Sequence, residues 1–135
     1  MIKCGKIDKP KKVVTLVQRK IYNFCKEKQI TLAEFFVKIQ NILYLPFIYR
    51  KRVVAGKTYP IPIGVGKFEY KQKNIIIRKI LFSVKSRRER KIIDRLYLEL
   101  IDIFNKVSPL IRARNEYLKG LSETKANRRF LKKKK

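Results

Sequence analysis

Apolar residues near the start of the chain recur every three or four positions, with polar residues between them. The repeat consists of Val13, Val17, Ile21 and Phe24. This spacing places the four side chains on one face of a helix. We therefore expect an amphipathic helix over about residues 13–28, with Asp8 as a start signal, preceded by a basic segment at residues 1–12.

A second helix is predicted by its own start signal. In Thr31-Leu32-Ala33-Glu34, the hydroxyl of Thr31 can accept from the amide of Glu34, and the Glu34 carboxylate can reach back to Thr31. Ile30 and Phe35 occupy the flanking positions of a hydrophobic staple. This helix should run to about Leu43 and end before Pro46.

From Phe47 to Val65 the apolar period changes from that of a helix to two. Pro60 and Pro62 lie within this stretch, and neither can donate a backbone hydrogen bond to a central strand. We expect an exposed β-ribbon over residues 46–66, with arms at 47–54 and from 58, and a turn at 55–57.

Helical spacing returns after the ribbon. A long helix is expected over about 69–85, with Ile76, Ile77, Ile80, Leu81 and Val84 as its buried stripe. A basic hinge at 86–91 separates it from a further helix that contains the acidic residues Asp94, Glu99 and Asp102. We read this helix as packed within the protein or against a basic neighbour.

Ser108-Pro109 separates these helices from a last one, and the chain ends in a lysine tail at 131–135. The pattern predicts a mainly α protein: a helical bundle of about five helices with one protruding β-hairpin ribbon, forming a single domain over residues 1–135.

Charge gives the first indication of function. The chain has 36 lysines and arginines against 10 acids, a formal charge of +26, and no histidine. A small fold cannot neutralise this charge internally, so the partner should be a polyanion, with nucleic acid as the default. Because 45% of the residues are hydrophobic, we expect a folded domain and not a disordered basic tail.

Other classes of protein lack support in the sequence. The apolar run from Ile42 to Tyr49 is too short to span a bilayer and is broken by Pro46, and the N-terminus has no apolar signal core. Cys4 and Cys25 fit no metal-ligand spacing and should be free thiols. We expect no catalytic residue, no metal site, no cofactor and no enzymatic activity, since histidine and a phosphate-binding glycine loop are both absent.

Three segments carry a resemblance to a known family. The ribbon R-V-V-A-G-K-T-Y-P-I-P-I, residues 52–63, resembles R-x-V-G-G-x-T-Y-Q-V-P-V of the universal small-subunit ribosomal protein seven family. Residues 77–87 and 95–102 are similar to that family's next two helices. Residues 112–119 and 126–130 resemble its K-K-R-E-D-x-H-R and A-N-x-A-F segments. The resemblance covers roughly residues 12–130.

The chain departs from the family pattern at several points. Ala55 stands where the family has the first glycine of the turn, Pro60 where it has glutamine, and Leu118 where it has histidine. The family's basic N-terminal arm looks shortened, and lysines replace its C-terminal extension. With a composition typical of A+T-rich codons, these departures suggest a mitochondrial protein of the matrix mitoribosome, with a plastid one as the alternative.

The resemblance implies a structural component of the small ribosomal subunit. It implies binding to the 3′ major domain of the small-subunit rRNA, which forms the head, and support of head assembly. It places the ribbon near the exit-site tRNA and the mRNA exit path. It also implies ribosomal proteins nine, eleven, thirteen and nineteen as neighbours, and no membrane partner.

Clustered cations without nearby acids are the candidate RNA ligands, because Arg can bond phosphate bidentately and Lys acts as a point charge. The set is Lys51, Arg52, Lys57, Lys71, Lys73, Arg78, Lys79, Arg87, Arg88, Arg90, Arg112, Arg114, Lys119, Arg128 and Arg129. Tyr49 and Tyr59 could stack on bases, although packing within the protein accounts for them more simply.

Two alternatives remain open. A basic amphipathic protein that binds anionic membranes should leave large apolar helix faces uncovered. Against this alternative, the apolar stripes of the predicted helices suffice to cover one another. An RNA-processing enzyme would need a cluster of unpaired acids to hold Mg²⁺, and the sequence offers none that we can assemble.

Overall fold

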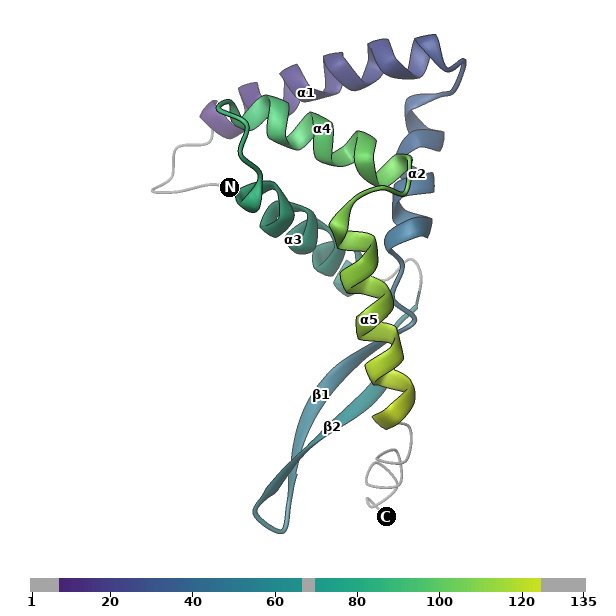
Figure 1. The fold of residues 1–135 in the computed structure, drawn as a ribbon, viewed down its shortest axis with the longest axis vertical. Coiled ribbons are helices and arrows are strands. Elements are labelled where there is room, and N and C mark those ends of the chain that lie inside the picture. Colours follow the sequence, from purple (N-terminus) through teal and green to yellow (C-terminus); the bar gives the residue numbers. More distant parts are fainter. Residues whose placement is uncertain (1–7, 67–69, 125–135) are drawn as a thin grey trace.

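The computed structural model describes residues 8–66 and 70–124, without the side chains at positions 54 and 121–123. These residues form five helices and one two-stranded antiparallel sheet (Figure 1), which confirms the predicted fold class. The helices α1 to α4 make a body at one end of the molecule. The ribbon and α5 extend away from this body in the same direction.

Helix α4 (Ile92–Phe104) is the centre of the helical body, because it packs against α1 (Asp8–Glu27), α2 (Leu32–Leu43) and α3 (Tyr70–Ser86). Ile21, Phe35 and Ile103 from three of these helices are at most 1% exposed. Their burial, with that of the surrounding aliphatic side chains, supplies the main stabilisation of the body.

Aromatic rings join α1, α2 and α4 in this core. Phe24 meets both Phe35 and Phe104 edge to face, with ring centroids 6.1 and 5.9 Å apart. Phe35 stacks on Phe104 at 5.0 Å. The predicted face of α1 is buried at Val17 and Ile21, but the helix begins at Asp8, ahead of the apolar repeat. Cys25 is a buried free thiol at the end of this face, and burial raises its pKa.

The start of α2 confirms the predicted capping box. The Glu34 amide donates to Thr31 Oγ1 at 3.2 Å, and the Thr31 amide donates to Glu34 Oε2 at 2.9 Å. Two backbone N–H groups that a helix start would otherwise leave unpaired are thereby satisfied.

The ribbon consists of β1 (Phe47–Val54) and β2 (Lys57–Gly64), which pair antiparallel from Phe47 opposite Gly64 to Val54 opposite Lys57. The connecting turn is Ala55-Gly56, with φ of 49° and 75°. Positive φ at both residues matches the twist of a two-residue hairpin turn. Ala55 therefore adopts a backbone conformation that glycine accepts at lower cost.

The base of the ribbon is fixed to the helical body. The Val65 amide donates to the carbonyl of Pro46 at 2.9 Å and closes the two arms. The buried amide of Gln72 on α3 can pair with both backbone groups of Leu45, its oxygen 2.7 Å from the Leu45 nitrogen and its nitrogen 3.2 Å from the Leu45 oxygen. Because Ile61 is also buried, the half of the ribbon next to the helical body is anchored, and the tip projects away from the body.

Helix α5 (Pro109–Glu123) follows the break at Ser108 and contacts α2 and α3. On α3, Ile76, Ile80 and Val84 are buried as predicted. Ile77 is 53% exposed, so its assignment to the buried stripe was wrong. The helices packed against α3 cover a narrower part of its surface than its apolar side chains span.

Candidate nucleic-acid interface

The ribbon carries its predicted cations on both faces. Lys51 and Lys57 are exposed, and Arg52 is partly buried. Strand alternation and the pairing register place Arg52 and Lys57 on one face of the ribbon and Lys51 on the other. Arg50, which was not in the predicted set, is exposed on the same face as Arg52. The projecting ribbon can therefore contact phosphates on either side.

Helix α5 supports the ribbon through a pair of tyrosines. The Tyr49 amide donates to the Tyr117 hydroxyl at 3.0 Å, and the two rings meet edge to face at 5.0 Å. A Cβ atom at Gly120 would lie only 3.3 Å from the Tyr49 hydroxyl oxygen, so glycine permits this close approach. Tyr49 is therefore engaged in packing, in agreement with the simpler of the two interpretations of this residue.

Two of the predicted cations lie beside this tyrosine pair. The ammonium group of Lys79 is 4.7 Å from the centre of the Tyr117 ring, a favourable cation–π distance. Arg114 donates through Nε to the Tyr44 carbonyl at 3.0 Å and through Nη1 to Asn115 Oδ1 at 3.0 Å. Burial, and the nearby charge of Arg114, lower the pKa of Lys79. Both cations thus stabilise the junction of α3, α5 and the ribbon while adding positive charge to it.

The remaining predicted cations on α3 and α5 are exposed: Lys71, Lys73, Arg78, Arg112 and Lys119. Lys71 and Arg78 are almost two turns apart and share one face of α3. Lys73 lies elsewhere on the helix, at the edge of an apolar groove. Arg128 and Arg129 lie outside the residues that the structure describes, as does the lysine tail.

The arginines of the basic hinge between α3 and α4 differ in their exposure and contacts. Arg88 and Arg90 are exposed. Arg87 turns toward α4, where its Nη1 lies 2.7 Å from both Glu99 Oε2 and Asp102 Oδ2, and its Nε lies 3.1 Å from Glu89 Oε1. Its side chain is 19% exposed, and that of Glu99 only 1%. The structure therefore brings Arg87 to three carboxylates and away from the other predicted cations.

Hydrogen bonding completes this carboxylate cluster, which we define as Arg87, Glu89, Glu99 and Asp102. Glu99 Oε1 accepts from the hydroxyls of Ser83 at 2.9 Å and Ser108 at 2.7 Å. Burial disfavours the charge on Arg87, but the hydrogen bonds from Asp102, Glu99 and Glu89 outweigh it and raise the Arg87 pKa. The cluster joins α3, the hinge, α4 and the start of α5. That Arg87 also binds RNA stays a prediction.

The sequence did not reveal these partners of Arg87. We had expected only that the helix with these acids packs within the protein or against a basic neighbour. In the structure, Glu99 and Asp102 lie 12 and 15 positions from Arg87 and meet it across the hinge. One signal in the sequence could have indicated that Glu99 is buried: it lies between Leu98 and Leu100, in the apolar part of its helix.

Sequence reasoning also missed a basic hollow between α1 and the start of α4. Its volume is about 380 Å³, and Arg19, Lys20 and Lys91 line it. Lys20 also pairs with Asp94 at 2.6 Å, and this bond lowers the Asp94 pKa. Three cations against the one acid of the lining, Asp94, leave this hollow positive, at the end of the body opposite the ribbon (Figure 1).

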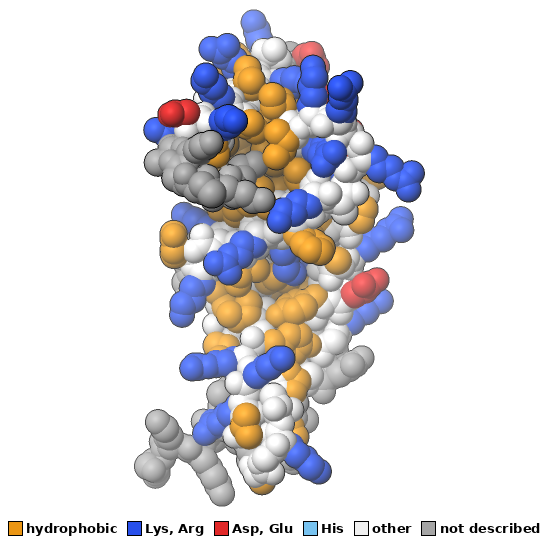
Figure 2. Space-filling model, turned by 90° about the vertical axis from the view of Figure 1, so that its left-hand side faces the viewer, with side chains coloured by type: hydrophobic (Ala, Val, Ile, Leu, Met, Phe, Trp, Pro, Cys, Tyr) orange, Lys and Arg blue, Asp and Glu red, His pale blue; other side chains and the backbone are white. Residues whose placement is uncertain are grey.

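Positive side chains are spread over the whole length of the face shown in Figure 2, whereas acidic ones are few. Apolar patches lie between them. Within residues 8–66 and 70–124, no helix combines the length and apolar character needed to cross a bilayer. In the same residues, no group of three or more His, Cys, Asp or Glu side chains is placed so that it could hold a metal ion. The arrangement suits an extended polyanion that contacts several separate ridges.

Comparison with known proteins identifies relatives of the chain. The family model described as ribosomal protein S7p/S5e matches residues 2–128. Proteins named small ribosomal subunit protein uS7 are similar in sequence. That of Petrotoga mobilis is 31% identical over 103 residues, which are 76% of this chain and 63% of that protein. That of Nautilia profundicola is 32% identical over 109 residues, 76% of this chain and 67% of the relative.

A longer match extends over nearly the whole chain. The small ribosomal subunit protein uS7 of Kosmotoga olearia is 29% identical over 130 residues, which cover 96% of this chain and 81% of the relative. In the first of these comparisons, by contrast, the chain spans less than two thirds of its relative's length.

Proposed function

The chain belongs to the ribosomal protein S7p/S5e family, and we propose on this basis that it is a structural, non-enzymatic constituent of the small ribosomal subunit. The observation that carries the proposal is the family match over residues 2–128. The excess of 36 cations over 10 acids supports the same function, since rRNA supplies the missing counter-charge.

The proposed ligand is the 3′ major domain of the small-subunit rRNA, whose head assembly the protein would support. A-form RNA presents phosphates, 2′-hydroxyls and shape, which suits a rigid body with basic ridges. The proposed contacts are the predicted cations of the ribbon, α3, the hinge and α5, together with Arg128 and Arg129. The ribbon would lie near the exit-site tRNA and the mRNA exit path, beside ribosomal proteins nine, eleven, thirteen and nineteen. The proposed location is the mitochondrial matrix, with a plastid as the alternative.

Co-sedimentation tests the function directly. Antibody against this chain should detect it with small ribosomal subunits from isolated mitochondria, at a constant ratio to subunit rRNA across a salt-washed gradient. Recovery only in ribosome-free fractions would contradict the function. Recovery with plastid subunits would correct the location alone.

A salt titration tests the electrostatic mechanism. With about six to ten phosphate contacts, affinity for a 3′ major domain RNA fragment should fall about 10³–10⁵-fold between roughly 50 and 200 mM salt. Alanine at both Lys51 and Lys57 on the ribbon should reduce the affinity more than alanine at both Lys11 and Lys12 on α1. All four are exposed, so both double variants remove the same charge from the surface. A flat titration would exclude phosphate contacts as the source of affinity.

A further inference from the structure

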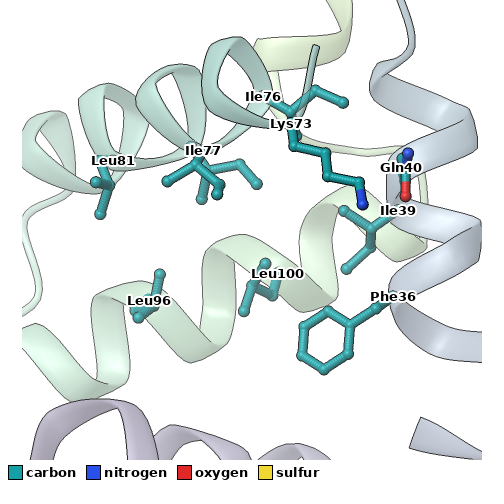
Figure 3. A pocket seen from close by; sticks show the side chains of 10 residues that line it. Phe36, Ile39, Gln40, Lys73, Ile76, Ile77, Leu81, Leu96 and Leu100 are labelled. Atoms are coloured by element: carbon teal, nitrogen blue, oxygen red, sulfur yellow. The ribbon is translucent and has the colours of Figure 1, made fainter. Parts of the chain in front are cut away.

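An apolar groove lies open between α2, α3 and α4, with a volume of about 800 Å³. Figure 3 shows side chains from all three helices directed toward the same space, among them Phe36, Ile77, Leu96 and Leu100. Apart from Gln40 and Lys73, the described residues that line it are aliphatic or aromatic. The predicted apolar stripes therefore do not fully cover one another.

Exposure at the groove is large for apolar side chains. Phe36 is 39% exposed and Ile77 is 53% exposed. Beyond the groove, Val37 on α2 and Phe82 on α3 are also exposed, at 55% and 78%. An exposed apolar groove of this size marks an interaction site more often than chance, because leaving it in water forgoes hydrophobic stabilisation.

The charges indicate what kind of partner fits the groove. No carboxylate is found among its described lining residues, and Lys73 is the single ion there. A second copy of this chain would bring another +26 charges against the first, which opposes self-association. RNA phosphates gain little from an aliphatic lining. A lipid surface fits a flat amphipathic face better than a concave groove bounded by three helices.

We propose that this groove receives an amphipathic helix of another protein, whose apolar side chains fill it and whose acidic side chain pairs with Lys73. Docking of a helix into a hydrophobic groove uses apolar anchors at positions i, i+3, i+4 and i+7, and the flanking acids match the positive charge of this chain. This inference goes beyond the proposed function, because it concerns a protein contact on a surface that the predicted RNA ligands largely leave free.

A defined peptide can test the groove in the full chain. The probe is a fluorescent helical peptide with leucine at i, i+3, i+4 and i+7 and glutamate between them. Its control is a scrambled peptide of the same composition, with leucine on no single face. At about 0.3 M salt, where exposed charges are screened, the helical peptide should bind at least about tenfold more tightly than the control. Equal binding of the two peptides would overturn the proposal.

Ile77→Lys separates docking in the groove from general attraction to a cation. The substitution raises the positive charge of the protein, so non-specific binding of an acidic peptide should be unchanged or stronger. Docking in the groove should weaken about tenfold or more. Val107→Lys is the matched control, since Val107 is 71% exposed and does not line the groove. Unchanged or tighter binding by the Ile77→Lys protein would refute the assignment of the site. Circular dichroism verifies that both variants keep their helices.

A photocrosslink identifies the natural occupant. With p-benzoylphenylalanine in place of Ile77, irradiation of the assembled native complex should attach this position to a segment with an apolar face and acidic neighbours. Mass spectrometry reads the segment. Crosslinks confined to RNA, to lipid or to a second copy of this chain would each overturn the proposal. Failure of co-sedimentation with ribosomal subunits would contradict the proposed function alone, because peptide binding does not depend on it.

Discussion

Arg87 and Arg114 are both partly buried arginines, but their surroundings differ in charge. Arg87 meets the carboxylates of Glu89, Glu99 and Asp102. Arg114 donates to a backbone carbonyl and an amide oxygen, and no carboxylate of the described residues is paired with it. It also lies close enough to Lys79 to lower the pKa of that lysine. In one region the acids outnumber the cation, and the other region keeps its positive charge.

This difference shows that a total charge of +26 does not describe how the charge is available to a partner. The protein has only 10 acids, and three of them surround one arginine. This cluster joins α3, the hinge, α4 and the start of α5. The junction of α3, α5 and the ribbon receives aromatic rings and carbonyl oxygens instead. Three of the acids thus stabilise the fold at one place, and the junction of α3, α5 and the ribbon keeps its charge for phosphate.

The largest expected effect comes from breaking the carboxylate cluster. Arg87→Ala leaves Glu99 buried without its cation, and loss of one partner of a buried pair costs about 3–5 kcal/mol. Arg88→Ala, at the next position and exposed, should change the free energy of unfolding by less than about 0.5 kcal/mol. Urea denaturation of the full chain measures both. Equal effects for Arg87→Ala and Arg88→Ala would show that the cluster does not stabilise the hinge.

A double substitution sharpens this test. Arg87→Met together with Glu99→Gln removes both charges, while the glutamine oxygen can still accept from Ser83 and Ser108. Most of the stability lost in Arg87→Ala should return, since the cost arises chiefly from an unpaired buried charge. If the double variant is as unstable as Arg87→Ala, the pairing of Arg87 with Glu89 and Asp102, which the double variant also lacks, is the dominant contribution instead.

The second expected effect concerns RNA affinity at the other region. Replacing Arg112 and Arg114 with alanine should weaken binding of a 3′ major domain fragment about 10²–10⁴-fold, because two charge-assisted hydrogen bonds at about 1.5–3 kcal/mol each are lost. The salt slope should fall by about 0.7–0.9 for each phosphate that the variant no longer binds. Helix content should change little. Unchanged affinity would exclude this part of α5 from the interface.

The single variants divide this effect. Arg112 is exposed, so its loss should affect the affinity and hardly the stability. Arg114 also bonds the Tyr44 carbonyl, so Arg114→Ala should affect both. Comparing urea midpoints with RNA affinities distinguishes the two roles, and equal urea midpoints for the two variants would show that the Tyr44 hydrogen bond adds no stability.

Local patterns in the sequence predicted the elements well. The capping box at Thr31 and Glu34 and the hairpin signal at Ala55-Gly56 each involve neighbouring residues, so they could be recognised without a fold. The contacts of Arg87 could not be predicted in this way, because Glu99 and Asp102 are 12 and 15 positions away and meet Arg87 only when the hinge folds. Exposure of Ile77 likewise depends on how far neighbouring helices reach, which the apolar period does not encode.

The same limit applies to the candidate site. Composition and clustering predicted which cations are candidate RNA ligands. They did not predict which of these side chains contact other groups of the protein instead. Lys79 became a half-buried partner of Tyr117 only through the packing of α3 against α5. The exposed positions Arg88, Arg90 and Arg112 carry no such contact among the residues described, so they remain the simplest candidates for phosphate binding.

A smaller effect is expected at the turn that presents the ribbon's cations. Ala55→Gly relieves a φ of 49° in a non-glycine residue and should stabilise the ribbon by about 1 kcal/mol. Slower hydrogen exchange at the amides of β1 and β2 measures this gain. As a control, Ala33→Gly on the exposed side of α2 should destabilise by about the same amount, because that position is helical. Faster exchange in the Ala55→Gly ribbon would show that the alanine is not strained.

The smallest expected effect concerns Glu34, an exposed carboxylate that contrasts with the buried Glu99. Its substitution tests what the charge of an acid contributes to stability without burial. The Thr31 amide, aided by the Thr31 side chain, lowers the pKa of Glu34 below its usual 4.5. Because the folded-state pKa is depressed, this contribution to stability is present above the unfolded-state pKa and is lost as pH falls through the folded-state value. Glu34→Gln should therefore be slightly less stable than the parent at pH 7, and the difference should shrink and then disappear as the pH falls below the usual 4.5 of a glutamate and through the lowered folded-state pKa. Glu116→Gln, at an exposed position on α5, serves as the control. A difference for Glu34→Gln that persists in acid, once Glu34 is protonated in the folded protein, would mean that amide and carboxylate cap the helix with different geometry, and that charge is not the cause.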